Sequence, residues 1–127
     1  MSERKAYNYA VIRVVPRVER DEFVNAGVIL FSPQKKFLGT RIALSEEKLR
    51  ALWPETPVEA IRNHLRAVER ICDGESDGGP IARLSLSERF QWLTSPRSTM
   101  IQISPVRTGL TAEPLATLEQ LAVDLIS

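Results

Sequence analysis

Residues 7–15 of this chain read YNYAVIRVV, and residues 23–31 repeat the same β-branched and aromatic pattern as FVNAGVILF. A third run of this kind covers residues 36–43. Side chains of these types favour strands, and runs of this length are typical of single strands. Between the second and third runs, residues 32–35 read SPQK, which places proline where a type I turn accepts it. The sequence therefore predicts three antiparallel strands, the last two joined by a tight hairpin.

Two helical patterns follow these strands. Ser45 stands before an acidic pair, as an N-cap before a first helical turn, and Pro54 ends that short helix. Thr56 and Glu59 have the spacing of a capping box for a second helix that extends to Cys72. Its apolar residues recur at helical spacing: Val58, Ile61, Leu65, Val68, Ile71 and Cys72. These residues predict the buried face of the most regular helix in the chain.

The second half of the chain contains weaker signals. A short helix is expected around residues 86–93, capped by Ser85 or Ser87, and a strand is expected at residues 99–104, between two prolines. A terminal helix with an apolar stripe is predicted to begin near Pro114.

The predicted fold class is α+β. An antiparallel sheet of three or four strands combines two N-terminal hairpin strands, a third strand and one C-terminal strand, and three or four helices cover it. A chain of 127 residues is the ordinary size of one domain, so we expect a single domain over residues 1–127. Glycine, aspartate and proline predict a flexible loop near residues 73–80.

The charge of +1 gives the molecule no global field that would attract nucleic acid or an anionic membrane. The longest apolar stretches are strand-sized, and no signal-type segment follows the amino terminus, so we expect a cytoplasmic protein without a membrane span.

Cys72 and His64 are the only residues of their kinds. Eight residues along one helix place them ~12 Å apart, too far to share one metal. We therefore expect no disulfide, no metal and no cofactor.

The first hairpin contains the least expected polar residues. Arg13 alternates in phase with the apolar residues of the first strand. Asn25 and Gly27 are expected to share a face of the second strand with Phe23, Ile29 and Phe31. If the connecting loop is centred on Glu19, Arg13 opposes Asn25 and Val11 opposes Gly27.

Two interpretations of this cluster stay open. Arg13, Glu22 and Asn25 could form a polar pocket in which Gly27 leaves room for a ligand or another backbone. Alternatively, they form a buried structural network, with Arg13 bonded to a carboxylate and Gly27 marking a bulge.

Other polar groups are weaker candidates. Arg97 and Arg107 each stand beside hydroxyls and loop amides that could hold an anion, but an extended chain would separate them by ~30 Å. The arginines at positions 62, 66 and 70 form a ridge that interleaved glutamates would neutralise.

His64 is expected at the surface. Cys72 is expected to be a buried, inert thiol, because it lies near a helix C-terminus whose dipole opposes thiolate formation.

Several short motifs are distributed along the chain: Tyr7-x-Tyr9, Arg13 followed by Pro16, Glu22-x-Val24-Asn25-x-Gly27-Val28, Ser95-Pro96-Arg97 and Ser104-Pro105-Val106-Arg107-Thr108-Gly109. Together they resemble an uncharacterised bacterial family, the domain of unknown function DUF3037. The resemblance spans residues 7–121, and the motif at residues 22–28 is its most specific part. It implies a small stand-alone protein, often encoded beside a kinase-like protein similar to bacterial persistence toxins. It implies no catalytic residues.

Three functional hypotheses follow. The first is an accessory module that binds a protein partner, with a homodimer also open, through a sheet edge or the Arg13 and Asn25 face. The second is an enzyme or small-ligand binder that uses the first-hairpin cluster, and a concave opening there would favour it. The third is a weak, salt-sensitive nucleic-acid binder that uses the arginine ridge.

Overall fold

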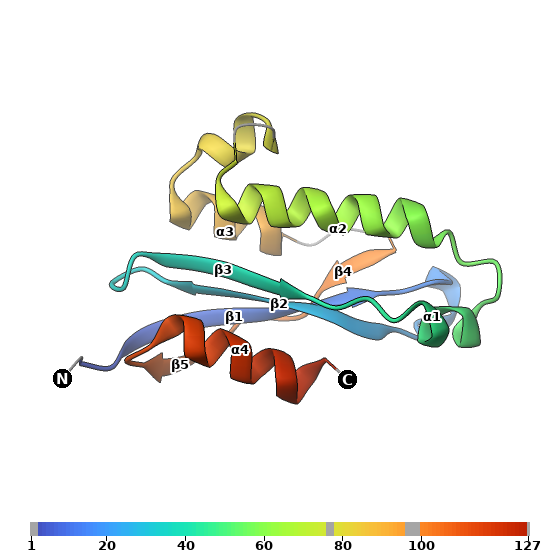
Figure 1. Ribbon diagram of the computed structural model, residues 1–127, viewed down its shortest axis with the longest axis horizontal. Coiled ribbons are helices and arrows are strands. Elements are labelled where there is room, and N and C mark those ends of the chain that lie inside the picture. Colours follow the sequence, from blue (N-terminus) through green and yellow to red (C-terminus); the bar gives the residue numbers. More distant parts are fainter. Residues whose placement is uncertain (1–2, 76–77, 96–99, 127) are drawn as a thin grey trace.

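The computed structural model describes residues 3–75, 78–95 and 100–126. Its strands and helices follow one another as β1 (Lys5–Val14), β2 (Val24–Ser32), β3 (Phe37–Ile42), α1 (Glu46–Leu52), α2 (Val58–Asp73), α3 (Leu86–Thr94), β4 (Ile101–Ile103), β5 (Arg107–Thr111) and α4 (Pro114–Leu125) (Figure 1). Short 3-10 turns occupy Val18–Arg20 and Pro80–Arg83. The predicted α+β class is confirmed, with an antiparallel sheet and helices on it.

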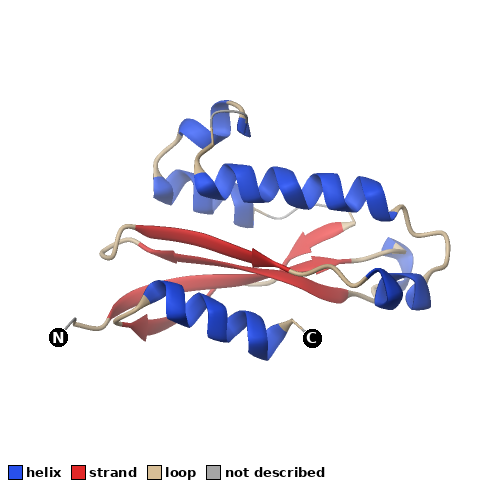
Figure 2. Ribbon diagram, viewed as in Figure 1, coloured by secondary structure: helices blue, strands red, loops and turns tan. Residues whose placement is uncertain are grey.

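The sheet has the order β3-β2-β1, and β4 and β5 both pair with the remaining edge of β1. All of these pairings are antiparallel. Helices α2 and α3 lie over one face of the sheet, and α4 lies over the other (Figure 2). The protein therefore has three layers: α2 with α3, the sheet, and α4. Strands β1 and β2 are the central strands of the sheet.

Each face of the sheet has its own apolar core. On the α2 side, Ile12, Ile29 and Phe31 pack with the buried stripe of α2, whose predicted members are all buried. On the α4 side, Val28 and Leu30 pack on Leu118 of α4, with the tyrosines of β1 around them.

The register of the first hairpin is partly as predicted. Arg13 pairs with Asn25, as expected, but Gly27 pairs with Ile12, so the predicted Val11–Gly27 pair is wrong. The register shifts between Ile12 and Arg13, because one extra residue of β2 is accommodated in a bulge.

This bulge changes which residues share a face. Asn25 lies on the α4 side, where its side chain bonds to Leu125 of α4, whereas Ile29 and Phe31 belong to the core on the α2 side. The prediction that Asn25 shares a face with Ile29 and Phe31 is therefore wrong. A strict two-residue alternation cannot persist across an inserted residue.

Strand β5 was not predicted. The expected strand at residues 99–104 is found as Ile101–Ile103, within the described part, and β5 follows after Pro105. The segment RTGLT of β5 has few strand-forming residues, and its strand conformation depends on pairing with Lys5 to Tyr9 of β1. Such long-range pairing leaves little local signal.

The helix ends agree with the sequence except at Thr56. Ser45 caps α1, and Ser85 caps α3 in a complete capping box with Glu88. Thr56 does not cap α2, which begins at Val58 without a side-chain cap. The Thr56 hydroxyl instead donates to the carbonyls of Leu49 (3.2 Å) and Trp53 at the end of α1, where helix carbonyls lack partners.

Candidate functional site

The candidate site lies where the C-terminal end of α4 leaves β1 and β2 uncovered. Arg13 and Asn25 face each other there across the first hairpin. The guanidinium carbon of Arg13 lies 4.5 Å from the centre of the Phe23 ring, so the cation is stacked on an aromatic face. This contact fixes the guanidinium group without neutralising it.

Asn25 connects the site to α4. Its side-chain Nδ2 donates to the carbonyl oxygen of Leu125 at 3.0 Å. Because a flipped amide would place two oxygens against each other, this bond also fixes which way Oδ1 points. The bond satisfies a carbonyl at the helix end, where the helix dipole is negative. Asn25 Oδ1 and Arg13 Nε are both buried, and neither has a hydrogen-bond partner among the described residues.

The break between β4 and β5 forms the opposite side of the site. Ser104 donates its backbone N–H to the Val11 carbonyl at 2.9 Å, and its hydroxyl accepts the Val11 N–H at 2.8 Å. The hydroxyl therefore takes the place of a strand carbonyl at the point where Pro105 interrupts the ladder. Pairing resumes with Tyr9 opposite Arg107, which brings that arginine to the site.

These elements enclose a hollow with a volume of about 230 Å³. Its lining residues are Tyr9, Val11, Arg13, Phe23, Asn25, Ser104, Arg107 and Leu125. Two are cations, none is a carboxylate, and the described part of the chain gives neither arginine an ion-pair partner. Arginine side chains that line one hollow without a carboxylate have the chemistry to bind carboxylate or phosphate oxygens.

The other predicted site residues lie elsewhere. Glu22 pairs with Arg20 at 2.6 Å and does not line the hollow. Gly27 leaves no room for a ligand, because a Cβ atom there would lie 3.0 Å from both the Arg41 carbonyl and an Ile12 methyl. The glycine instead permits the close approach of another backbone. Arg97 lies outside the described residues, so only Arg107 of that predicted pair can be placed.

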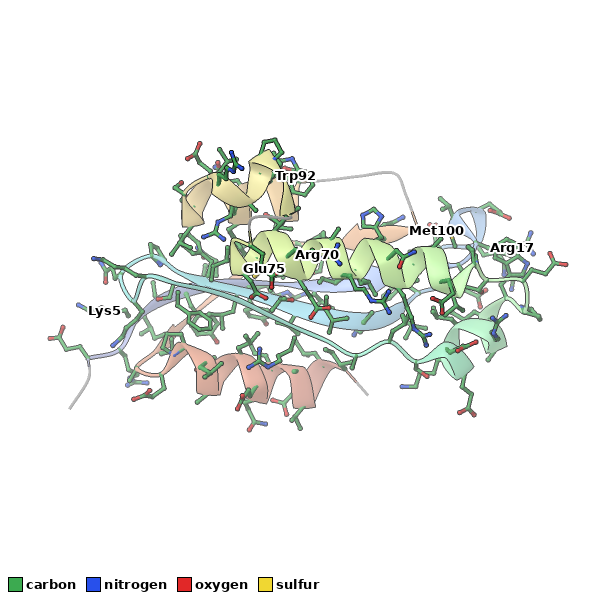
Figure 3. All side chains as sticks on the ribbon, turned by 45° about the horizontal axis from the view of Figure 1, so that its top comes forward. Lys5, Arg17, Arg70, Glu75, Trp92 and Met100 are labelled. Carbon is green, nitrogen blue, oxygen red and sulfur yellow. The ribbon has the colours of Figure 1, made fainter. Side chains whose placement is uncertain are left out.

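The arginine ridge on α2 is partly neutralised, since Arg62 is ion-paired while Arg66 donates to the neutral Asn63 Oδ1 at 3.0 Å. Arg62 pairs with Glu59 at 3.1 Å and with Glu46 at 3.4 Å. Arg70, near the C-terminal end of α2, and Glu75, just beyond it, line the same shallow surface depression and lie near each other (Figure 3). Alternating charges of this kind are typical of a solvated helix face, and they weaken the case for nucleic-acid binding.

His64 and Cys72 take no part in the site. His64 is exposed on α2, as predicted. Cys72 is buried, and burial above all, with a smaller contribution from Asp73, raises the pKa of its thiol to about 12. Within residues 3–75, 78–95 and 100–126, no three His, Cys, Asp or Glu side chains lie together as metal ligands would. None of the helices described is long and apolar enough to span a membrane.

Sequence reasoning proposed Arg13 and Asn25 as residues of one site, and both line the hollow. It singled out Arg107 without placing it beside Arg13, and it did not include Tyr9, Ser104 or Leu125 in the site. The available signal was the combination of a proline inside a strand-like segment with an arginine two residues later, which is typical of an interrupted edge strand.

Comparison with known proteins gives one family. The pattern of the family described as "Protein of unknown function (DUF3037)" matches residues 9–126. Neither the curated proteins nor the solved structures include a match. The matched segment covers nearly the whole chain and includes the hollow and the elements that form it. The chain therefore belongs to the DUF3037 family, as its motifs indicated.

Proposed function

We propose that this protein is a binding module that recognises a small anionic group, a carboxylate or a phosphate, through Arg13 and Arg107. The observation that carries the proposal is that two arginines from different strands line one hollow to which the described residues contribute no carboxylate. Several arginines elsewhere in the described part of the chain are ion-paired, as Arg41 is with Glu119 and Arg50 with Glu46.

The size and lining of the hollow limit the ligand. A volume of about 230 Å³ is below the roughly 300–1,000 Å³ of pockets that enclose drug-sized ligands. The walls combine the polar groups of Arg13, Ser104 and Arg107 with the apolar surfaces of Val11 and Leu125. A small acid, or one acidic group of a larger molecule, has the matching chemistry.

The accessory, protein-binding role implied by the family resemblance stays a prediction. It is compatible with the proposal, because a partner could present an acidic side chain to the same hollow. The proposal itself requires only the anionic group.

The test is an NMR titration of ¹⁵N-labelled protein with acetate and, separately, with phosphate at constant ionic strength. We expect saturable amide shifts at Tyr9, Asn25 and Leu125. Hydrogen bonds to charged groups contribute about 1.5–3 kcal/mol, so Arg107→Ala should raise the Kd roughly tenfold or more. Arg13→Lys, which keeps the charge but loses the planar fork, should also weaken binding.

Arg83→Ala is the matched control, because Arg83 is exposed on a different part of the surface and does not line the hollow. It removes the same charge and should leave the Kd unchanged. Absence of saturable shifts at the hollow, or equal weakening by Arg83→Ala and Arg107→Ala, would contradict the proposal, because the arginines would then act only through net charge.

A further inference from the structure

A second hollow adjoins the first. It has a volume of about 200 Å³, and Lys48 and Val24 line it together with Phe23, Asn25 and Leu125. The last three residues also line the hollow that contains Arg13 and Arg107. The two hollows are therefore neighbours on either side of Phe23, Asn25 and Leu125, and we call the pair of hollows the groove.

Lys48 supplies the charge of the second hollow. It lies in the first turn of α1, where its backbone N–H donates to Ser45 Oγ at 3.2 Å. Its side chain is exposed, and none of the ion pairs between described residues includes it. Glu46, an acid of the same helix turn, is engaged by Arg50 at 3.0 Å and by Arg62 at 3.4 Å. The charge of Lys48 is therefore available to a ligand.

Phe23 lies between the two charged ends. Its side chain lines both hollows and is 46% exposed, a large fraction for an aromatic ring. Arg13 stacks on this ring within the first hollow. An exposed ring between cations at both ends of a groove matches a molecule with an apolar middle and two anionic ends.

We infer that the ligand of this groove is a small dicarboxylate, with one acid group bound by Arg13 and Arg107, the other by Lys48, and its carbon chain on Phe23. The inference rests on the proposed function and specifies the ligand class of the same site. A dicarboxylate has both anionic ends and the short apolar chain, and inorganic phosphate lacks the chain. Each hollow is large enough to hold one acid group with part of the carbon chain.

The test compares succinate, glutarate and adipate with butyrate, each titrated into the full chain by NMR at one fixed ionic strength. We expect the best dicarboxylate to bind about three- to fivefold more tightly than butyrate, because it makes one additional ion pair with the exposed Lys48. Lys48→Ala should abolish this difference and leave the butyrate Kd unchanged. Lys35→Ala, in the turn between β2 and β3 at the far end of the sheet, removes the same charge and should preserve the difference.

The outcomes separate the two proposals. Equal binding of butyrate and all three dicarboxylates would overturn the inference and leave the anion-binding function standing. A dicarboxylate preference that survives Lys48→Ala would overturn the assignment of the second acid group to Lys48. If none of the four acids binds at the hollow, both the proposed function and the inference are wrong.

Discussion

Ser104→Ala should destabilise the protein chiefly by removing one buried hydrogen bond. The hydroxyl also donates to the Pro105 carbonyl at 3.1 Å, and this bond is lost as well. The Ser104 hydroxyl accepts the Val11 N–H at 2.8 Å, and both residues are buried, with Ser104 only 6% exposed. Alanine keeps the backbone bond from Ser104 N–H to the Val11 carbonyl but leaves the Val11 N–H without a partner. An unsatisfied buried donor costs about 1–3 kcal/mol, so we expect the free energy of unfolding to fall by that amount.

Urea unfolding of wild type and variant measures this change as a lower midpoint with an unchanged m-value. Ser87→Ala is the matched control, because Ser87 is exposed on α3 and Ser85, rather than Ser87, caps that helix. The control should change the free energy of unfolding by less than about 0.5 kcal/mol. If Ser104→Ala proves no more destabilising than Ser87→Ala, the hydroxyl does not replace a strand carbonyl, and the account of the β4–β5 break is wrong.

Three further predictions concern packing and reactivity. Arg89→Ala should destabilise the protein by about 2–4 kcal/mol in urea unfolding, because the 9% exposed Arg89 donates from Nη1 to the carbonyls of Ile71 (3.0 Å) and Cys72 (3.1 Å) at the end of α2. A loss below 1 kcal/mol would mean that water replaces the guanidinium. Gly109→Ala should lower the melting temperature, at a cost of about 1–3 kcal/mol, because its Cβ would lie 2.6 Å from the Tyr7 ring; unchanged thermal unfolding would show that the ring moves freely. The Cys72 thiol, with a pKa of about 12, should resist iodoacetamide at pH 8 in the native state and react only after unfolding, and rapid native alkylation would contradict its burial.

The regular elements of the fold could be predicted because their signals are local. The hairpin strands and the stripe of α2 follow from side-chain types and spacing over a few residues. Gly27 indicated a bulge under one of the two interpretations, but the register that the bulge produces could not be predicted, since it depends on how β1 and β2 meet rather than on either sequence alone. It opposes Gly27 to Ile12 and places Asn25 on the α4 side.

The candidate site also combines residues that local patterns indicated with contacts that those patterns could not indicate. Arg13 and Asn25 stood out because polar residues on an apolar strand face need an explanation. The position of Arg107 opposite Tyr9 depends on pairing between the two ends of the chain, and so does the Leu125 carbonyl beside Asn25. Local patterns contain no information about such contacts, so the sequence could propose residues for the site but could not assemble it.

The contrast between Arg13 and Arg89 favours the ligand hypothesis over a purely structural network. Both have a buried Nε without a partner among the described residues. Arg89 directs a terminal nitrogen at two helix carbonyls, which accounts for its burial. Arg13 has no hydrogen-bond acceptor in the described part of the chain and stacks on Phe23 at the edge of a hollow. Because a buried donor without a hydrogen-bond partner is costly, an anionic ligand that accepts from Arg13 Nε would offset a cost that the described residues leave uncompensated.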